Sequence, residues 1–390
     1  MSLVNVDIAI VGAGIAGQTL ALALAQRDFS VAIVDANDIS KNITEEFSPR
    51  VSAISKASER ILKNVGAWRN IQRMQAYTDM QVWEDQGFGR IAFSAQENKI
   101  ENLGHIIENN CLTQALFETA SSIKNIQFFD GQKISAINRS DDQQLINLEN
   151  GDMISAKLIV GADGGNSFVR KTAGFALTFW DYDHIAIVAN IQTELPHKLI
   201  AKQAFTASGP LAFLPLWDSY PCSIVWSQDK SKAAELLKLS NEEFNKALAV
   251  AFDCTLGICE LVSEKQSYPL KMRYSRQWVG NRVVIIGDAA HTIHPLAGQG
   301  VNLGISDAVA LAEQIIKLVE QNKDFGLAKN LRPFERWRKT ETVKMIAAME
   351  GFKRLFAGSQ PVTKLIRDTG LTLANLSSLT KQKIIKQAMG

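Results

Sequence analysis

A glycine-rich stretch in the C-terminal third of the chain, residues 282–307, most constrains the fold. It opens with four apolar β-branched residues at 283–286, a pattern typical of a parallel strand that is covered on both faces. Gly287 and Asp288 follow directly, so the strand is expected to end at an acid that can accept hydrogen bonds from a ribose or another polyol. This pattern favours an α/β domain with a ligand at the carboxyl end of the strand.

The residues after this acid predict a tight turn and the start of a helix. Pro295, Gly298 and Gly300 keep bulky side chains out of the turn and leave backbone N–H groups free at the helix N-terminus. Such a terminus suits an anionic or electron-rich ligand. An ordinary strand–turn–helix is the alternative, but the glycines, the proline and Asn302 in one register favour a ligand site.

A second glycine motif lies near the N-terminus and consists of Gly12, Ala13, Gly14, Ile15, Ala16 and Gly17. A strand is expected at 6–11, directly before the motif, and a helix at 18–26 continues from it. A second strand at 31–34 ends in Asp35. The motif therefore lies in a βαβ unit, which is the context that a dinucleotide-binding fingerprint requires.

Each residue type in this fingerprint has a physical role. Gly12 makes the turn, Gly14 lets the backbone approach a pyrophosphate, and Gly17 permits close packing of helix on strand. Asp35 is placed to bind the hydroxyls of the adenosine ribose. The fingerprint alone does not distinguish NAD from FAD.

Two strings carry a family resemblance. Gly287-Asp288-Ala-Ala-His291 and the string His-Pro-Leu-Ala-Gly-Gln-Gly-Val-Asn-Leu-Gly at 294–304 resemble the second FAD motif of single-component flavin aromatic hydroxylases. The form is that of their ubiquinone-biosynthesis branch (UbiH/UbiF/UbiI). Strings at 177–182, 212–216, 222–227 and 387–390 are most similar to the UbiI (VisC) group, the 2-polyprenylphenol 6-hydroxylases. The resemblance covers essentially the whole chain.

The resemblance implies a Rossmann-like FAD-binding domain and a monooxygenase reaction. FAD would be the cofactor, NADPH or NADH the co-substrate, and O₂ would hydroxylate a polyprenylphenol through a flavin C4a-hydroperoxide. The loop with Pro295, Gly298 and Gly300 would face the flavin, and no side chain is assigned as a catalytic base. Together with the N-terminal motif, the residues expected to bind FAD are Gly12, Ala13, Gly14, Ile15, Ala16, Gly17, Asp35, Arg50, Asn109, Asp163, Gly287, Asp288, Pro295, Gly298, Gln299, Gly300, Val301 and Asn302.

Three of these residues have a plain structural alternative. Arg50 corresponds to an arginine near the flavin in the resembled family, or it is a surface residue. Asn109 stands where the ubiquinone branch carries asparagine and many other flavin hydroxylases carry arginine, or it caps the following helix. Asp163 resembles the acid of an Asp-Gly motif near FAD and the nicotinamide, or it precedes a helix that Asn166 or Ser167 caps.

The chain divides into a discontinuous cofactor domain, an inserted β-sheet domain and a helical end. The expected ranges are 1–75, 101–175 and 276–330 for the FAD-binding domain, 76–100 and 176–275 for a mostly antiparallel substrate sheet, and 331–390 for C-terminal helices. The substrate pocket is expected in the inserted sheet, at His184, Phe213, Pro215 and Trp226. A lone histidine among apolar residues is more often structural, so His184 has that alternative.

Composition excludes several other function classes. The four cysteines form no CxxC pair, so we expect neither a metal site nor a disulfide framework, and a reducing compartment fits best. The sequence contains no Ser/His/Asp set and no Walker loop for hydrolytic or phosphoryl-transfer chemistry. The apolar run at 8–25 mimics a signal anchor, but Asp7 precedes it and glycines interrupt it.

Positive charge is concentrated at the C-terminal end. The net charge of the chain is +2, yet residues 331–390 carry twelve basic and four acidic residues, a net of +8. A stripe of Met345, Met349, Phe352 and Phe356 follows helical spacing there. It is either packed core or, with the basic charge, a surface that docks on an anionic membrane or on a ubiquinone-biosynthesis complex.

The expected location is therefore the cytoplasm, peripheral to the inner membrane, with no nucleic-acid partner. A homo-oligomer stays open, as do hydroxylation at another ring position of the same pathway and two other functions. One is a flavin-dependent prenyl-lipid reductase, which would not insert oxygen. The other is a non-catalytic FAD-binding member of a biosynthetic assembly. Substrate-dependent consumption of NAD(P)H and O₂, with a hydroxylated product, distinguishes the hydroxylase from both.

Overall fold

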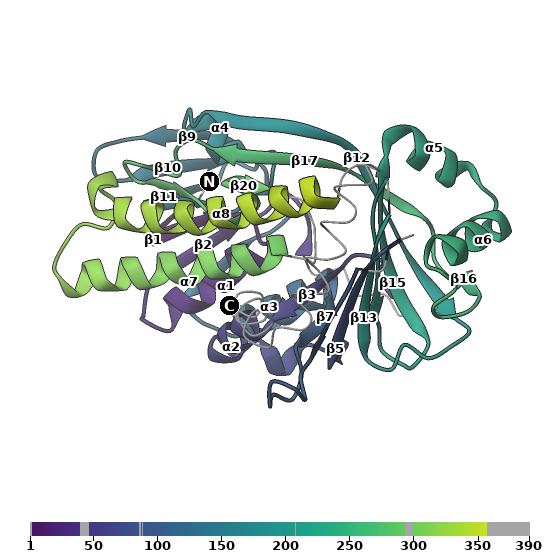
Figure 1. The fold of residues 1–390 in the computed structure, drawn as a ribbon. Helices are drawn as coiled ribbons and strands as arrows, with labels where there is room; N and C mark the ends of the chain where they lie inside the picture. The colour runs from purple at the N-terminus through teal and green to yellow at the C-terminus, as the bar shows by residue number, and fades with distance from the viewer. Residues whose placement is uncertain are drawn as a thin grey trace.

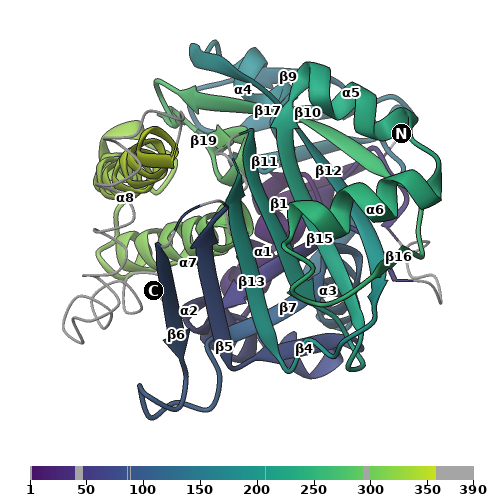
Figure 2. The ribbon, with the colours of Figure 1, turned by 45° about the vertical axis from the view of Figure 1, so that its right-hand side comes forward.

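The structure is a computed structural model that describes residues 2–39, 47–85, 87, 89–206, 208–292 and 299–356. Two large β-sheets lie next to each other (Figure 1). One lies in the half that is expected to bind the cofactor, and the other in the inserted half. Long helices cover the first half, and two shorter helices cover the outer face of the second sheet (Figure 2). The arrangement confirms the expected α/β domain with an inserted, mostly antiparallel sheet.

The first sheet has, within the described residues, the path β18-β19-β11-β1-β2-β8, with β10 and β9 added beside β11. Its central strands β19, β11, β1, β2 and β8 run parallel, as their continuous apolar runs predict. The strands are β1 (Leu3–Val11), β2 (Val31–Val34), β8 (Ile126–Phe129), β9 (Ile134–Arg139), β10 (Gln144–Leu148), β11 (Met153–Gly161), β18 (Val279–Gly280) and β19 (Val283–Ile285).

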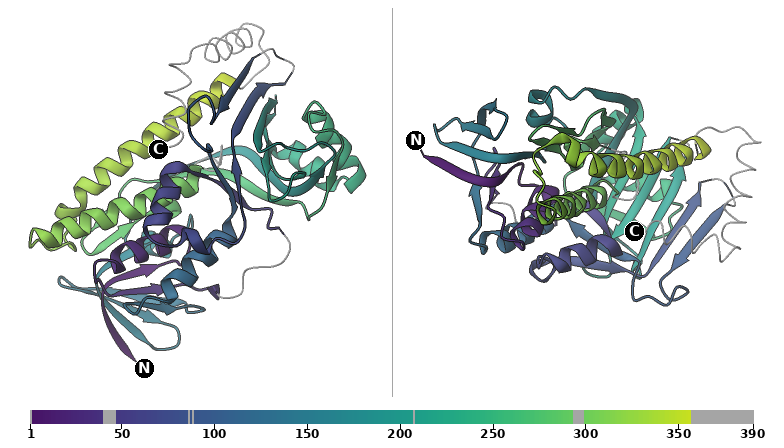
Figure 3. Two further views of the ribbon diagram at one scale, coloured as in Figure 1. Left: turned by 90° about the horizontal axis from the view of Figure 1, so that it is seen from below. Right: turned by 90° about the vertical axis from the view of Figure 1, so that its left-hand side faces the viewer.

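Helices pack on this sheet and on one another. Helix α1 (Ile15–Ala25) contacts both α3 (Asn109–Ser121) and α7 (Gln299–Glu320). Helix α8 (Ala328–Phe356) lies alongside α7 (Figure 3). The short α4 (Phe168–Thr172) follows β11. None of the helices in the described ranges is long and apolar enough to cross a membrane.

The second sheet follows the path β20-β17-β12-β15-β14-β13-β5-β6 among the described residues, with β16 beside β12. Its pairs are antiparallel except for β13 and β5. Helices α5 (Lys230–Lys238) and α6 (Asn241–Ala251) cover one face. The strands are β5 (Asp79–Glu84), β6 (Arg90–Ser94), β12 (Leu177–Thr193), β13 (Ile200–Thr206), β14 (Gly209–Pro215), β15 (Pro221–Asp229), β16 (Cys259–Leu261), β17 (Gln266–Ser275) and β20 (His291–Thr292).

A small sheet joins the two halves. It pairs β3 (Val51–Ser55) and β4 (Met74–Tyr77) with β7 (Gly104–Glu108). Helix α2 (Lys56–Asn64) and the 3-10 turn η2 (Trp68–Asn70) follow β3 along the chain. The segment before β3 crosses to the second sheet, where Asn190 donates to the carbonyl of Phe47 and Ser223 to that of Pro49.

Element boundaries differ from the sequence expectation in two instructive places. Helix α1 begins at Ile15 and not at 18, because the glycine motif itself forms the first helical turn. Strand β12 spans seventeen residues, where only 185–191 has the alternating pattern, because partners β15, β16 and β17 extend the pairing along it.

Candidate functional site

The glycine motif lies at the carboxyl edge of the first sheet, between β1 and α1. Gly12 has a left-handed backbone (φ +105°), and an added Cβ would lie 2.3 Å from the carbonyl oxygen of Ala162. A Cβ on Gly17 would lie 2.1 Å from the carbonyl oxygen of Gly12. Both glycines are therefore required by the protein's own packing.

Two other glycines are not required by the protein. A Cβ on Gly14 or on Gly300 would meet no atom of the structure within 4 Å. Gly14 is the N-cap of α1, where no side chain caps the helix and no acid lies in the first turn. Gly300 lies in the first turn of α7 with a helical backbone. The uncapped start of α1 and the open position at Gly14 fit an anionic ligand.

Asp35 follows β2 at the same edge. Its Oδ2 accepts a hydrogen bond from the Ala13 backbone N–H at 2.8 Å, and its Oδ1 accepts one from Asn37 at the same distance. The carboxylate thus holds the glycine loop in place while its side chain stays half-buried. Oδ1 also accepts from Asn37 Nδ2 at 3.2 Å, whereas Oδ2 keeps a second acceptor position among the described residues, so a role in binding a ribose stays a prediction.

The Gly287–Asp288 turn follows β19 at the same carboxyl edge of the first sheet. It forms the 3-10 turn η3 (Gly287–Ala289). Gly287 adopts a left-handed conformation (φ +57°). A Cβ on it would approach Ala16 of α1 to 3.3 Å, so small residues let η3 and α1 pack closely. Ala16 thus has a packing role in the structure.

Asp288 is exposed to solvent and has a pKa that the surrounding protein changes. Desolvation by the surrounding protein nevertheless raises the pKa of Asp288, and the charges of His291, Arg50 and Arg273 act in the opposite direction. The Asp288 carboxylate is therefore accessible to a ligand and lies near the side chains of His291, Arg50 and Arg273.

The two arginines near Asp288 come from distant parts of the sequence. Arg50 precedes β3, and its guanidinium lies 5.2 Å from the ring centroid of Tyr268 on β17. Arg273, also on β17, was missed by sequence reasoning. It pairs with Thr292 in the sheet and lies against Gly165, but no local motif marks it. An arginine from the segment before β3 and one from β17 therefore lie near Asp288.

Asn302 and Asn109 hold β3 in position. Asn302, on α7, accepts from the Ser55 N–H at 2.9 Å and donates to the carbonyl of Ala53 at 2.8 Å. Asn109 accepts from the hydroxyl of Ser52 at 2.7 Å. It is the first residue of α3 and not its N-cap, which is Glu108, so the alternative of a helix cap is wrong. Both side chains fix the strand that carries Arg50.

The loop after β11 shows the helix cap that the structural alternative for Asp163 predicts, and its role near FAD stays a prediction. Ser167 caps α4 by accepting from the Arg170 N–H, as the structural alternative predicts. Asp163 Oδ2 also accepts from Phe168 N at 2.6 Å and Val169 N at 3.1 Å. Arg170, another residue that sequence reasoning missed, donates to the carbonyls of Gly165 and Ala289, each at 2.9 Å. It joins this loop to η3.

The expected substrate pocket requires a correction. Phe213 stacks on Phe252 with ring centroids 3.6 Å apart, and Trp226 packs edge-on against Phe244 of α6. Both belong to the core between the second sheet and its own helices, on the face turned away from the first sheet. Strand alternation places Pro215 on the side of Phe213. These side chains form a structural core, because α5 and α6 already occupy that face.

The opposite face carries a smaller apolar cluster of Ala186, Val188 and Leu270, with Val225 and Tyr268 packed against it. Arg50 lies over this Tyr268 ring. His184 is near the margin, where Nδ1 contacts the Tyr182 carbonyl at 2.6 Å and Nε2 contacts Asp229 at 3.2 Å. Both ring nitrogens of His184 are thus engaged, which supports its structural alternative.

Part of the expected site lies outside the described residues. Pro295 and Gly298 fall in 293–298, and the side chains of Met349, Phe352 and Phe356 are also outside the description. Ile15 and Val301 are half-buried in the first turns of α1 and α7, where Gln299 begins α7. In the part of the chain that is described, no three His, Cys, Asp or Glu side chains are grouped so that they could hold a metal ion.

The residues present fit FAD. The uncapped start of α1 and the open position at Gly14 suit a pyrophosphate. Asp35 and Asp288 flank that position as hydroxyl acceptors, and the open position at Gly300 leaves room beside α7 for a flat ring system.

Comparisons with known proteins agree with this fit. A family model described as "FAD binding domain" matches residues 5–329. The chain is 33% identical over 387 residues to the 3-demethoxyubiquinol 3-hydroxylase of Escherichia coli (strain K12), which covers 98% of each. It is 31% identical over 385 residues to the ubiquinone hydroxylase UbiL of Rhodospirillum rubrum, covering 98% of this chain and 89% of the relative. The crystal structure of p-nitrophenol 4-monooxygenase PnpA from Pseudomonas putida DLL-E4 matches with a TM-score of 0.81 at 18% identity, over 100% of this chain and 99% of that one, which concerns the fold alone.

Proposed function

The chain belongs to the FAD binding domain family of flavoprotein monooxygenases, and on this premise we propose that it hydroxylates the aromatic ring of a polyprenylphenol in ubiquinone biosynthesis. FAD is the cofactor, and NAD(P)H is the co-substrate typical of the family. The observation that carries the proposal is that Asp288 and Arg50 lie near each other beside the apolar face of the second sheet, where Arg50 lies over the Tyr268 ring.

FAD supplies the redox chemistry, since the reduced flavin activates O₂ for transfer of an oxygen atom. The protein's part is to bind, orient and exclude water. Asp288 and Asp35 hold the cofactor by its hydroxyls. Val188, Val225 and Tyr268 form the wall against which the phenol ring lies, and Arg50 closes the space above Tyr268.

The reaction does not require a strong side-chain base. A phenol is electron-rich, so its ring attacks an electrophilic oxygen without prior deprotonation by an acid–base residue. This agrees with the engaged ring nitrogens of His184. The main task of the site is then to hold the ring close to the flavin and to keep water away from the reactive oxygen.

The ring position is a finer proposal. The strings at 177–182, 212–216 and 222–227 favour hydroxylation of a 2-polyprenylphenol at position 6, as in the UbiI group. A second candidate is hydroxylation at position 3 of a demethoxyubiquinol, which the name of the E. coli relative favours. The two reactions share cofactor, oxidant and prenylated ring, so the site described here serves either.

The test uses the purified holoprotein. Its flavin spectrum is recorded, and it is then incubated with NADH or NADPH, isotopically labelled O₂, and either a 2-polyprenylphenol or a demethoxyubiquinol. We expect substrate-dependent NAD(P)H oxidation and one labelled oxygen atom in the product, and mass spectrometry identifies which substrate is used. NAD(P)H oxidation that reduces the substrate without incorporating label would support the prenyl-lipid reductase instead. Bound FAD without turnover would support a non-catalytic binding protein.

A further inference from the structure

A buried carboxylate lies behind the Gly287–Asp288 turn. Asp307, on α7, is wholly buried. Its Oδ2 accepts from the Gly287 backbone N–H at 3.1 Å and lies 2.6 Å from His291 Nε2. Its Oδ1 accepts from Arg338 Nε at 2.6 Å. One carboxylate therefore joins the turn after β19, strand β20 and helix α8.

The cluster is balanced in charge. Burial opposes ionisation of Asp307, but His291 and Arg338 outweigh it and lower the pKa of Asp307. The other nitrogen of His291, Nδ1, is buried and has no hydrogen-bond partner among the described residues, so a proton there would be an unsatisfied donor. Nε2 of His291 therefore donates to Asp307, and Asp307 and Arg338 form an ion pair.

This carboxylate contacts the turn at the point that sets the direction of Asp288. Gly287 has a left-handed backbone, and its N–H is the group bonded to Asp307. Trp278, which is fully buried, packs against the His291 ring with centroids 5.1 Å apart and so holds the imidazole in place. Without an acceptor at Asp307, both the Gly287 N–H and the His291 N–H would lose their partner inside the protein.

We propose that Asp307 is a positioning residue for the cofactor site, and that with His291 and Arg338 it holds the Gly287–Asp288 turn in the conformation that presents Asp288 to FAD. This inference rests on the assignment of Asp288 as an FAD ligand. It gives α8, which begins the basic C-terminal part of the chain, a direct link to the cofactor site.

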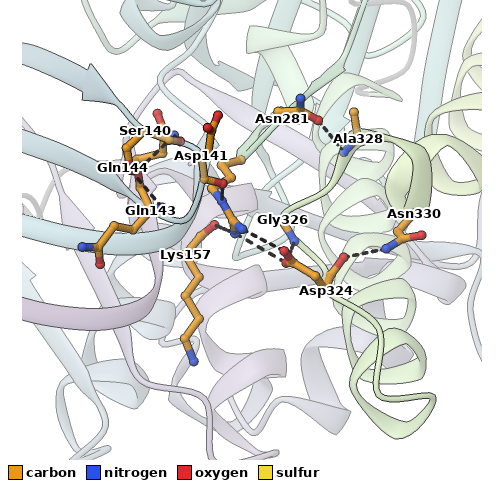
Figure 4. Close-up of polar contacts among 11 residues, drawn as sticks. Ser140, Asp141, Gln143, Gln144, Lys157, Asn281, Asp324, Gly326, Ala328 and Asn330 are labelled. Atoms are coloured by element: carbon orange, nitrogen blue, oxygen red, sulfur yellow. Dashed lines mark hydrogen bonds and ion pairs between the residues drawn. The ribbon is translucent and has the colours of Figure 1, made fainter.

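A matched control lies at the other end of the same strand. Arg282 precedes β19, is buried, and forms an ion pair with Asp324 in the α7–α8 connection at 2.7 Å. Figure 4 shows Asp324 with its neighbours Gly326 and Asn330, which bond to its carboxylate and its carbonyl. Both ion pairs tie the ends of β19 to the same helix pair, but only the Asp307 pair contacts the turn.

The experiment compares Asp307→Asn with Asp324→Asn in the full chain. Apo-protein melting temperature, the Kd of FAD from fluorescence quenching, and the visible circular dichroism of bound flavin are measured for each. We expect Asp307→Asn to raise the Kd of FAD at least about tenfold and to change the dichroism. Asp324→Asn should lower the melting temperature while its Kd stays within about twofold of the wild type.

A double variant separates positioning from charge burial. Asp307→Leu with Arg338→Met removes both charges, so apo-protein stability should recover relative to Arg338→Met alone, whereas FAD affinity should stay low because Gly287 still lacks its acceptor. If Asp307→Asn does not fold, Arg338→Lys and Arg338→Met are compared instead. Arg338→Lys keeps the charge, so it should retain most of the FAD affinity that Arg338→Met loses. Recovery of both stability and affinity in the double variant would overturn the proposal, as would equal Kd values in Asp307→Asn and Asp324→Asn. Wild-type FAD affinity in Asp288→Ala would instead remove the premise.

Discussion

At the scale of single residues, the site depends on two carboxylates with different surroundings. Both oxygens of Asp35 accept from backbone N–H groups, one from Ala13 in the glycine motif and one from Asn37 in its own loop. Asp288 is exposed, and no hydrogen bond to its side chain appears among the described residues, while desolvation raises its pKa. An acid in this state gains most from a ligand that donates hydroxyl protons to it.

Asp288→Ala should therefore abolish tight FAD binding and leave the fold intact. The side chain supports no part of the described structure, so the melting temperature of the apo-protein should change by less than the equivalent of about 0.5 kcal/mol, as for other surface substitutions. The measurement is the flavin-to-protein ratio after gel filtration, with apo-protein melting as the control. A variant that retains one FAD per chain would contradict the assignment.

A second residue-scale prediction concerns acid stability. His197 is buried, with Nε2 2.6 Å from the Asp218 carbonyl and Nδ1 accepting from the Leu199 N–H. Burial lowers the pKa of His197 from its usual 6.5. As pH falls, His197 of the unfolded chain is therefore protonated at a higher pH than His197 of the folded chain. The contribution of neutral His197 to the free energy of unfolding is complete above pH 6.5 and is lost as pH falls below it.

Denaturant midpoints measured at about pH 7.5 and about pH 5.5 check this sign. The wild type should be less stable at the lower pH, and each pKa unit of difference corresponds to about 1.4 kcal/mol. His197→Gln should lose less on acidification. The decline should not vanish, because burial also lowers the pKa of His105. An equal loss in both proteins would assign the acid sensitivity to other groups.

At the scale of elements, the start of α7 separates what the fold needs from what the cofactor needs. Gly300→Ala should leave the apo-protein as stable or raise its stability by up to about 1 kcal/mol, since alanine favours a helix and the added methyl meets no atom of the described residues within 4 Å. The same methyl would enter the space assigned to the flavin. We therefore expect weaker FAD binding or slower flavin reduction.

Gly17→Ala is the contrasting control, because its Cβ would clash with the Gly12 carbonyl and so destabilise the apo-protein itself. Thermal melts without FAD and stopped-flow reduction by NAD(P)H compare the two variants. If Gly300→Ala binds and reduces FAD like the wild type, the flavin does not lie beside this turn.

The two faces of the second sheet give a paired prediction. Phe213→Ala should cost about 3–5 kcal/mol in free energy of unfolding, since a stacked, fully buried ring is removed from the α6-side core. Val225→Phe, on the other face, should cost much less. It should instead release more H₂O₂ per NAD(P)H, because a larger side chain displaces the phenol ring from the flavin. Unchanged coupling in Val225→Phe would place the substrate elsewhere.

This sheet also marks the limit of what sequence could predict. Strand alternation separates Phe213 and Trp226 from Val225, but both faces of the sheet are apolar, so alternation does not tell which face meets the cofactor. The βαβ unit and the Gly287–Asp288 turn were predictable because each is a local motif. Arg273 and Asp307 were not, because their roles depend on β17–β20 pairing and α7–α8 packing between distant segments.

At the scale of the whole molecule, three of the basic side chains described on α8 are already paired. Arg338 bonds to Asp307, and Lys339 and Lys344 form ion pairs with Glu335 and Glu341. Arg332 and Arg336 are exposed on α8. Trp337, next to Arg336, is 51% exposed, and an indole with neighbouring cations is typical of a membrane interface. A polyprenylphenol is nearly insoluble in water, so we propose that this face of α8 meets the anionic surface of the inner membrane.

Neutralising Arg332 and Arg336 together, as Arg332→Gln and Arg336→Gln, should weaken binding to anionic liposomes about thirtyfold at low salt. The reason is that each cation near such a surface contributes about 1 kcal/mol. FAD content and turnover of a soluble short-chain phenol should not change, whereas turnover of a long-chain substrate in liposomes should fall. Sedimentation with vesicles of stated phosphatidylglycerol content measures the first effect, and product formation measures the second.

Lys232→Gln with Lys246→Gln, which neutralises two exposed cations on α5 and α6, is the matched control. An equal loss in that control would mean that total charge alone matters, and no loss in the α8 variant would leave this helix a solvated surface.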